Sequence, residues 1–369
     1  MKLESFNNRV PFNDVSRRYA SLESLKVEIS TLIERGPYLN GEHTARFQEN
    51  FAKYIGADYC LGVSSGTVAL ELALASLLLP KFSKVLVAAN SGGYGSIAIQ
   101  KNQLLPCYID VNENGILNPE SILSATEGVS AVIVTHLYGQ TMQLDLLAKS
   151  LREKNIFLIE DCAQSAGALI GEDRAGSFGD LSTFSFYPTK NLGAIGDAGA
   201  VCTSSPLIYE RLKKLREYGW SNRYFAEIAM GGNNRIDEIQ ALVLNLQLKK
   251  LDGWNIQRRA IWSRFKRAAE QSSLRLIGSN SESFVAHLAV IETESRESFQ
   301  NYMNENGIDT AIHYPYPDYV QPGLTIEPFR SSLPITERLC SSVVSLPLYP
   351  EMTEDEIVRV ETSIANYGS

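Results

Sequence analysis

The chain has 369 residues, of which 44% are hydrophobic and 21% are charged, and its formal net charge is −8 at pH 7. This length and composition are typical of a soluble globular protein with two or three domains. The acidic balance and the lack of any lysine and arginine cluster argue against a surface that binds nucleic acid or anionic membranes.

The cysteines and the apolar runs predict a cytoplasmic protein. The five cysteines are dispersed and no two form a CxxC pair, which indicates reduced, buried thiols rather than a disulfide framework. Residues 1–9 contain no apolar core of a signal peptide. The most apolar run, residues 68–79, is interrupted by Glu71 and is too short to cross a bilayer.

Residues 15–203 predict an α/β domain. Helices are expected over residues 15–35 and 44–55, each ending at a glycine, and an apolar strand follows at 59–63. Further strands are expected at 84–88, 106–110, 131–135, 156–160, 182–186 and 200–203, with helices at 68–78, 96–100 and 144–154 among them. Short apolar strands between helices predict a mostly parallel sheet covered on both faces, with ligands at the carboxyl ends of its strands.

The last third of the chain predicts a smaller α+β domain. A helical run at 238–251 is followed by a second helix at 254–272, and then by strands at 284–291 and 345–348 and helices at 296–306 and 354–366. We therefore expect a large domain over residues 1–253, which includes an N-terminal arm, and a small domain over 254–369.

Lys190 lies in an apolar, glycine-flanked segment, shortly after Phe184, Phe186 and Tyr187. Because burying an ammonium requires its desolvation, a lysine in such surroundings indicates an amine with a lowered pKa, as a nucleophile or Schiff-base lysine requires. The structural alternative is a lysine that extends from a strand end into solvent.

Two further segments follow predicted strands. Ser65, Gly66 and Thr67 stand between a strand and a helix, where backbone N–H groups bind phosphate, although serine and threonine also serve as ordinary helix caps. Glu160 and Asp161 follow the strand at 156–160, and such a pair suits Mg²⁺, a ribose, a cationic ring nitrogen or a turn cap.

One cofactor, pyridoxal phosphate, uses all three features. Its aldehyde needs a lysine, its pyridine nitrogen needs a carboxylate, and its phosphate needs backbone and hydroxyl donors. A metal site is less favoured because the four histidines show no HxH or HxxxH spacing, and a Walker-type site because no GxxxxGK[ST] motif occurs. We expect no metal.

With these residues in place, the chain resembles the DegT/StrS (DegT/DnrJ/EryC1/StrS) family of sugar-nucleotide aminotransferases almost from end to end. The matching segments are residues 36–41 (GPYLNG), 47–67, 136–140 (HLYGQ), 160–164 (EDCAQ), 184–193 (FSFYPTKNLG), 233–241 (NNRIDEIQA), 313–315 (HYP) and 345–350 (SLPLYP). Together these motifs are highly specific.

The resemblance implies the aspartate-aminotransferase fold (fold type I) and a homodimer with shared active sites. Lys190 would be the catalytic Schiff-base lysine and proton shuttle, and Asp161 would pair with the pyridinium nitrogen. Gln164 would contact the cofactor ring, and Asn233 would reach the phosphate of the cofactor that is bound in the partner subunit. The resemblance also implies that the cofactor phosphate would be held by Gly66, Thr67 and Ser185. The residues that would contact the sugar nucleotide are Tyr218 and His313.

The chain departs from the family pattern in three places. The family usually has an aromatic residue that stacks on the cofactor ring near Gly92. We expect Tyr94, two residues later, to take that role by a shifted path of the loop, and the alternative is that no aromatic residue stacks there. Ala166 stands where many members have a histidine. Tyr319 also stands where histidine is common, so we include it among the substrate-binding residues and expect a different substrate choice.

The implied function is transamination of a 3-keto or 4-keto deoxysugar linked to a nucleoside diphosphate, with L-glutamate as amino donor, in the biosynthesis of amino sugars for lipopolysaccharide or another surface polysaccharide. Three alternatives stay open: a related sugar dehydratase, whose members typically have histidine in place of Lys190; a fold-type-I lyase or decarboxylase; and a non-catalytic regulatory homologue.

Overall fold

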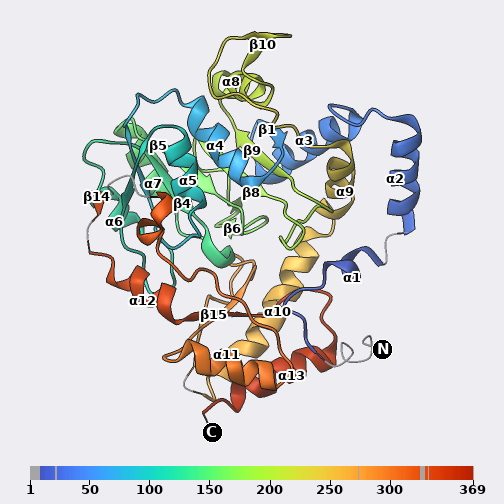
Figure 1. Cartoon of the computed structure of the whole chain (residues 1–369), viewed down its shortest axis with the longest axis vertical. Helices are drawn as coiled ribbons and strands as arrows, with labels where there is room; N and C mark the ends of the chain where they lie inside the picture. Colours follow the sequence, from blue (N-terminus) through green and yellow to red (C-terminus); the bar gives the residue numbers. More distant parts are fainter. Residues whose placement is uncertain (1–8, 21–22, 273, 325–328, 331, 369) are drawn as a thin grey trace.

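The computed structural model describes residues 9–20, 23–272, 274–324, 329–330 and 332–368. Its main feature is an eight-stranded sheet with the strand order β1-β9-β8-β5-β4-β2-β3-β14 (Figure 1). Within this sheet β9 is antiparallel to both neighbours, and the other pairs are parallel. The strands are β1 (Tyr59–Val63), β2 (Lys84–Val87), β3 (Leu105–Tyr108), β4 (Val129–Thr135), β5 (Phe157–Asp161), β8 (Leu181–Ser185), β9 (Gly199–Thr203) and β14 (Phe329–Arg330).

Alternating side chains of these strands enter two different apolar cores, one on each face of the sheet. In β4, Val132 and Val134 pack on one face and Ala131 and Ile133 on the other, as the period of two in a strand requires. The first face is covered by α3 (Glu42–Ile55), α6 (Pro119–Ser124), α7 (Asp145–Glu153) and α9 (Glu238–Leu248). The second is covered by α4 (Gly66–Ser76), α5 (Tyr94–Lys101) and α8 (Pro206–Arg216). The strands are thus buried on both faces, as in other sheets that helices cover on both sides.

A second, antiparallel sheet forms the smaller unit in the lower part of Figure 1. It contains β12 (Arg275–Ile277), β13 (Ala289–Glu292) and β15 (Val343–Leu346), in that order. Its core includes Phe265, Phe299 and Val360, which come from the three helices α10 (Leu251–Ala269), α11 (Arg296–Glu305) and α13 (Glu354–Ala365). The long helix α10 connects this unit to the large sheet.

The remaining elements are short or peripheral: α1 (Val15–Ala20), α2 (Glu23–Arg35), α12 (Pro334–Ser342), the hairpins β6 (Leu169–Ile170) with β7 (Asp173–Arg174) and β10 (Trp220–Asn222) with β11 (Phe225–Ala226), and three 3-10 turns at Leu137–Gly139, Asp318–Val320 and Pro322–Leu324. Among the helices of the described residues, none combines the length and apolar character needed to cross a membrane.

The elements predicted from the sequence agree with the structure in order, with a few differences. Two helices, α1 and α2, replace the single helix expected over 15–35. The strand expected over 284–291 is shorter, because the N–H groups of Val285 and His287 donate to the carbonyls of Gly139 and Tyr138 in the large domain instead of a neighbouring strand. Helices α6, α8 and α12, the strands β12 and β14 and the two short hairpins β6–β7 and β10–β11 were not predicted. Strand β14 also shows that part of the chain beyond residue 254 returns to the large sheet.

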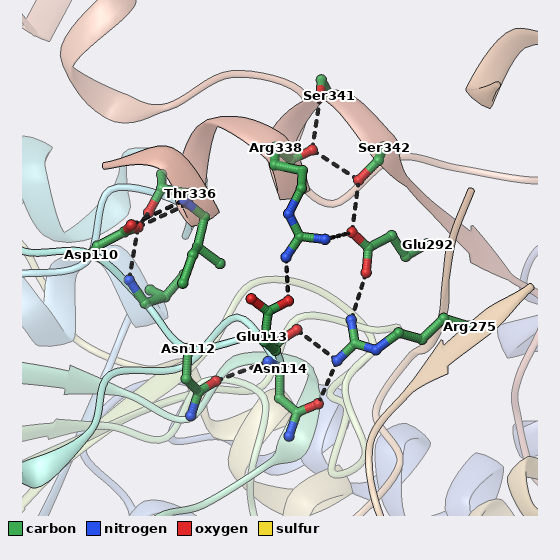
Figure 2. A network of polar contacts seen from close by, with 12 residues as sticks. Asp110, Asn112, Glu113, Asn114, Arg275, Glu292, Thr336, Arg338, Ser341 and Ser342 are labelled. Carbon is green, nitrogen blue, oxygen red and sulfur yellow. Dashed lines mark hydrogen bonds and ion pairs between the residues drawn. The ribbon is translucent and has the colours of Figure 1, made fainter. Parts of the chain in front are cut away.

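A polar network joins the two units on the side of α12 (Figure 2). Glu292 of β13 accepts hydrogen bonds from Arg275 of β12, at 2.5 Å, and from Arg338 of α12. Arg338 also pairs with Glu113, and Arg275 donates to the carbonyl of Glu113 at 2.8 Å, so both arginines reach the loop that follows β3. The network connects three elements of the C-terminal part to one loop of the large sheet.

Asp110, in the same loop, caps helix α12 from outside that helix. Its carboxylate accepts hydrogen bonds from the backbone N–H groups of Ile335 and Thr336, at 2.9 and 2.8 Å, and from the Thr336 hydroxyl at 2.8 Å. Leu333, the residue at the cap position of α12, offers no side-chain oxygen. The carboxylate therefore satisfies donors that the helix itself leaves unpaired.

We expect Asp110→Ala to destabilise the protein by about 1–2 kcal/mol, the usual effect of losing a helix cap. The midpoint of unfolding in urea, followed by circular dichroism, measures this loss. The matched control is Glu305→Ala, which removes an exposed carboxylate from the end of α11. Equal midpoints for the two variants would contradict the capping role of Asp110.

Candidate active site

A cavity of about 380 Å³ lies at the carboxyl edge of the large sheet. Because β1, β2, β4, β5 and β8 are parallel, the residues that end or follow them meet at this edge, as is usual for ligand sites in such sheets. The smaller unit closes the other side of the cavity with His287, His313 and Tyr314. From the large sheet, the lining includes Ser65, Gly66, Thr67, Ser91, Tyr94, Thr135, Asp161, Gln164, Ser185 and Lys190.

Lys190 stands in a turn that begins directly after β8. Its backbone N–H donates to the carbonyl of Tyr187 at 2.8 Å, and its own carbonyl accepts a hydrogen bond from the buried Arg18 of α1 at 3.0 Å. Burial lowers the pKa of the Lys190 amine from 10.5 to about 8, although the nearby Asp161 favours the charged form. The lysine is therefore a partly buried, reactive amine and not a solvated one.

The lowered pKa predicts how fast the apoprotein captures an aldehyde. With a pKa of about 8, about a quarter of Lys190 is neutral at pH 7.5, whereas about 0.1% would be neutral at the ordinary pKa. The rate at which added pyridoxal phosphate develops its visible absorption band, measured by stopped flow, should rise with pH through a midpoint near 8. Asp161→Asn should move this midpoint lower, because it removes the charge that stabilises the ammonium. A midpoint near 10.5 in the unmodified chain would contradict the prediction.

Asp161 ends β5 with its carboxylate buried. The side chain is 6% exposed, and it accepts hydrogen bonds from the Ala163 N–H at 3.1 Å and from the Thr135 hydroxyl at 3.2 Å. Burial raises the pKa of Asp161, while these two donors and the charge of Lys190 oppose the rise. A buried carboxylate of this kind is favoured by a cationic partner placed in the cavity.

The start of α4 lies close to the end of β8. Ser65 caps the helix by accepting a hydrogen bond from the Val68 N–H at 3.2 Å, which leaves the N–H groups of Gly66 and Thr67 at the helix start. A Cβ atom at Gly66 would lie 2.6 Å from the Cβ of Ser185. Glycine at this position thus lets the helix start approach Ser185 closely, and the two segments together present backbone and hydroxyl donors.

Gln164 connects both sides of the cavity. Its amide oxygen accepts a hydrogen bond from the Tyr138 N–H at 2.6 Å, and its amide nitrogen donates to the Tyr314 hydroxyl at 3.2 Å. The first contact fixes which end of the amide faces Tyr314.

Glu160, the neighbour of Asp161, faces away from the cavity and braces a turn. Its two oxygens accept hydrogen bonds from the N–H groups of Gly176, Phe178 and Gly179, each at 2.8 Å, and one of them also contacts His136 Nε2 at 3.2 Å. For Glu160 the cap interpretation of the acidic pair therefore applies, whereas Asp161 lines the cavity.

The structure brings eight of the predicted site residues to the cavity: Gly66, Thr67, Tyr94, Asp161, Gln164, Ser185, Lys190 and His313. Tyr319 does not reach it. Its ring is 7% exposed and packs near Tyr108, and its hydroxyl donates to Glu337 at 2.6 Å, so it belongs to the core on the α4 face.

Tyr218 and Asn233 also lie outside this cavity, but next to each other. The Tyr218 N–H donates to the carbonyl of Gly232 at 2.9 Å, and the backbone of Asn233 forms an isolated antiparallel β-bridge with Glu217. Both residues are exposed, near the α8 and β10 segment at the top of Figure 1.

Sequence reasoning missed several residues of the site. Phe12 and Asn13 line the cavity, and Arg18 holds the turn of Lys190, although nothing in the pattern of the N-terminal segment indicated this. His287 lines the cavity too, and its Nδ1 contacts Asn191 Oδ1 at 2.8 Å, beside Lys190. Tyr314 belongs to the HYP segment, whose histidine was the only residue singled out.

The residues of the cavity fit pyridoxal phosphate. A reactive amine, a buried carboxylate and a helix start with a close hydroxyl line one cavity, and they correspond to the aldehyde, the ring nitrogen and the phosphate of that cofactor. Lys190, Asp161 and the Ser65–Thr67 turn with Ser185 would hold these three groups.

Comparisons with known proteins agree with this assignment. The model of the DegT/DnrJ/EryC1/StrS aminotransferase family matches residues 22–365. A curated relative from Aneurinibacillus thermoaerophilus, named dTDP-3-amino-3,6-dideoxy-alpha-D-galactopyranose transaminase, is 36% identical over 97% of this chain and 99% of its own length.

Solved structures show the same fold. DesV from S. venezuelae, in complex with a ketimine intermediate, has a TM-score of 0.91 and 33% identity, and the match covers 97% of this chain and 98% of that one. NtdA from Bacillus subtilis, with the bound cofactor PMP, has a TM-score of 0.88 and 27% identity over 97% of this chain and 84% of that one. The chain belongs to the DegT/DnrJ/EryC1/StrS aminotransferase family and is a pyridoxal-phosphate-dependent aminotransferase of the aspartate-aminotransferase fold.

Proposed function

We propose that the chain transfers an amino group from L-glutamate to a keto-deoxysugar that is linked to a nucleoside diphosphate. The observation that carries the proposal is Lys190, an amine of lowered pKa in the same cavity as Asp161 and the helix start of α4. A lysine in this setting can both hold an aldehyde cofactor and move protons.

The cofactor supplies an electron sink at its ring, and the chain supplies everything else. Asp161, buried at the end of β5, keeps a proton on the ring nitrogen, because a buried carboxylate strongly favours a cation beside it. The Gly66 and Thr67 N–H groups with Ser185 bind the phosphate and thereby set the position of the ring. Lys190 would hold the aldehyde of the cofactor, and its neutral amine, once free, would accept a proton from the donor carbon.

The acceptor sugar enters the same cavity in the second half of the reaction, and Lys190 moves protons in the reverse sense. His313 lines the cavity, and burial lowers its pKa to about 4, so its ring is neutral. Its Nδ1 is paired with the Ser345 hydroxyl at 2.8 Å, which leaves Nε2 as the nitrogen for a ligand. A neutral ring suits the hydroxyl groups of a sugar. Amination at C3 is supported by the 36% identical relative, which is named as a transaminase of a dTDP-linked 3-amino sugar.

Lys190 also distinguishes this function from its alternatives. The related sugar dehydratases typically have histidine in place of this lysine, whereas this chain has Lys190. The intact set of Asp161, Gln164, Ser185 and Lys190 argues against a regulatory protein without catalysis. A lyase or decarboxylase acting on an amino acid would use the same residues. The products of the reaction distinguish it from a transaminase.

We further propose a homodimer in which Asn233 and Tyr218 serve the site of the partner subunit. Both are exposed and lie side by side outside their own cavity. Exposed apolar side chains of the kind found at subunit interfaces occur along the same large domain: Tyr38, Leu39, Tyr187, Ile195, Tyr224, Phe225 and Met230.

We propose that the chain divides into two domains, residues 1–253 and 254–369. We also propose that it acts in a cytoplasmic pathway that makes amino sugars for a lipopolysaccharide or another surface polysaccharide.

The proposal is tested with the holoenzyme and a matrix of amino donors and keto-sugar nucleotides. L-glutamate is compared with L-glutamine and L-aspartate, and the acceptors are 3-keto and 4-keto deoxysugars on dTDP, UDP and GDP, with products read by mass spectrometry. We expect an amino sugar and one equivalent of 2-oxoglutarate, each dependent on the other substrate. Release of carbon dioxide or ammonia without an acceptor would show a decarboxylase or lyase instead.

A further inference from the structure

Gly92 lacks the side chain that would otherwise point toward the cavity, and an aromatic ring fills the space. The residue has a φ of +79°, and a Cβ atom built on it would lie 2.9–3.1 Å from three ring atoms of Tyr314. Ordinary Cβ atoms do not approach a ring that closely, so the Tyr314 ring rests directly on the backbone of Gly92. Tyr314 also lines the cavity together with Asp161, Gln164 and Lys190.

Contacts on both sides hold the ring of Tyr314 in place. Its hydroxyl accepts the hydrogen bond from Gln164 Nε2 at 3.2 Å. The carbonyl of the preceding residue, His313, accepts a hydrogen bond from the Tyr138 hydroxyl at 2.6 Å. Tyr138 also presents its N–H to Gln164, so one residue positions both the amide and the backbone that flank Tyr314.

The segment after Tyr314 is bonded to the large domain, although it lies in the chain between two strands of the small one, β13 and β15. Asp318 is fully buried and accepts hydrogen bonds from the Gly93 N–H at 3.0 Å and the Ser96 hydroxyl at 2.6 Å. Its own N–H donates to the carbonyl of Ala89 at 2.8 Å. The position of Tyr314 relative to Gly92 is therefore fixed by bonds on the same loop, and the ring is preorganised.

Tyr94, the aromatic residue expected to stack on the cofactor, lines the same cavity and contacts Tyr314. Its side chain is 45% exposed, and its ring meets Tyr314 edge to face, with centroids 6.2 Å apart and an interplanar angle of 76°. Tyr94 thus packs against the edge of Tyr314 at the cavity wall. Burial raises the pKa of the Tyr314 hydroxyl, and the charges of Tyr94 and Asp161 add to this rise.

We propose that Tyr314 is the aromatic side chain that packs against the ring of bound pyridoxal phosphate, in the space that Gly92 leaves open. An aromatic ring in contact with the cofactor ring adds dispersion and quadrupole interactions and restricts the tilt of the cofactor. The proposal rests on the cofactor dependence of the family and not on the sugar or the amino donor.

The test measures binding of pyridoxal phosphate to the apoprotein without any substrate, so its outcome is independent of the proposed reaction. The dissociation constant comes from titration, and the circular dichroism of the visible cofactor band reports the fixed tilt of the ring. Tyr314→Ala should weaken binding on the order of tenfold and reduce the dichroism. Tyr314→Phe should keep the dichroism, because it retains the ring and loses only the bond from Gln164. Tyr94→Ala, the matched control, should change both quantities less than Tyr314→Ala.

A double-mutant cycle with Gly92→Ala isolates the contact from general damage to the fold. The added methyl group should displace the Tyr314 ring and weaken binding in the unmodified chain, but it should have a smaller effect when residue 314 is already alanine. The strain of a positive φ is present in both backgrounds and cancels. Additive losses in this cycle, or a larger loss for Tyr94→Ala than for Tyr314→Ala, would overturn the proposal.

Discussion

Replacing Lys190 with alanine is expected to abolish turnover and the visible absorption band that the protein acquires with pyridoxal phosphate. The amine both binds the cofactor and carries the proton, and proton transfer alone is typically worth ~10²–10⁴-fold, so we expect a loss of about 10⁴-fold or more. Turnover is measured as formation of 2-oxoglutarate from L-glutamate in the presence of a keto-sugar nucleotide, and the band is measured by absorption.

Lys53→Ala serves as the control, because Lys53 is an exposed lysine on α3. The absorption band and the turnover of Lys53→Ala should equal those of the unmodified chain. Undiminished turnover in Lys190→Ala would refute the mechanism. Persistence of the band with loss of turnover would mean that another amine binds the cofactor and that Lys190 acts only in proton transfer.

Replacing Asp161 with asparagine is expected to preserve the fold and to slow the reaction with the amino donor by about 10²–10³-fold, the range for losing one preorganised electrostatic contact. Asparagine has nearly the same shape, and its amide oxygen can still accept the hydrogen bond of the Ala163 N–H, while its NH2 group can donate to the Thr135 hydroxyl oxygen. It cannot supply the negative charge that keeps the ring nitrogen protonated. Single-turnover formation of the 2-oxo acid, with the cofactor in excess, measures the effect.

Asp197→Asn is the matched comparison, since Asp197 lines the same cavity but is exposed. It removes the same charge from a solvated position, where interactions are screened, and should slow the reaction far less. Similar losses for the two variants would show that the general charge of the cavity matters rather than the buried position of Asp161.

Much of the large domain could be predicted from local patterns. Apart from β14, the strands of the sheet coincide with short, largely apolar runs bounded by turn residues, and residues 59–63 form a strand with the predicted bounds. The alternation with helices predicted a mostly parallel sheet, because parallel strands need helical crossovers. The carboxyl ends of those strands then placed Gly66, Asp161 and Lys190 at one edge. Local sequence contains this information since strand and helix periodicity depend on neighbouring residues.

Other features depended on contacts between distant residues and had no local signal. The strand predicted from residue 284 begins at Ala289, because the backbone before it bonds to the Tyr138–Gly139 turn of the other domain. Helix α12 has no cap in its own sequence and takes one from Asp110, 226 residues earlier than Thr336. A pattern of single residues cannot anticipate a partner so far along the chain.

The sequence by itself determined the chemistry of this protein: a lysine in apolar surroundings, a carboxylate at a strand end and a glycine-containing helix start are the groups that pyridoxal phosphate requires. Only the tertiary structure decided which residues surround that chemistry. It removed Tyr319 to the core, brought His287 and Arg18 to the site, and placed Tyr314 on Gly92. The reason is physical, since reactivity follows from the type of a group and its immediate neighbours, whereas the shape of a cavity depends on how two domains pack.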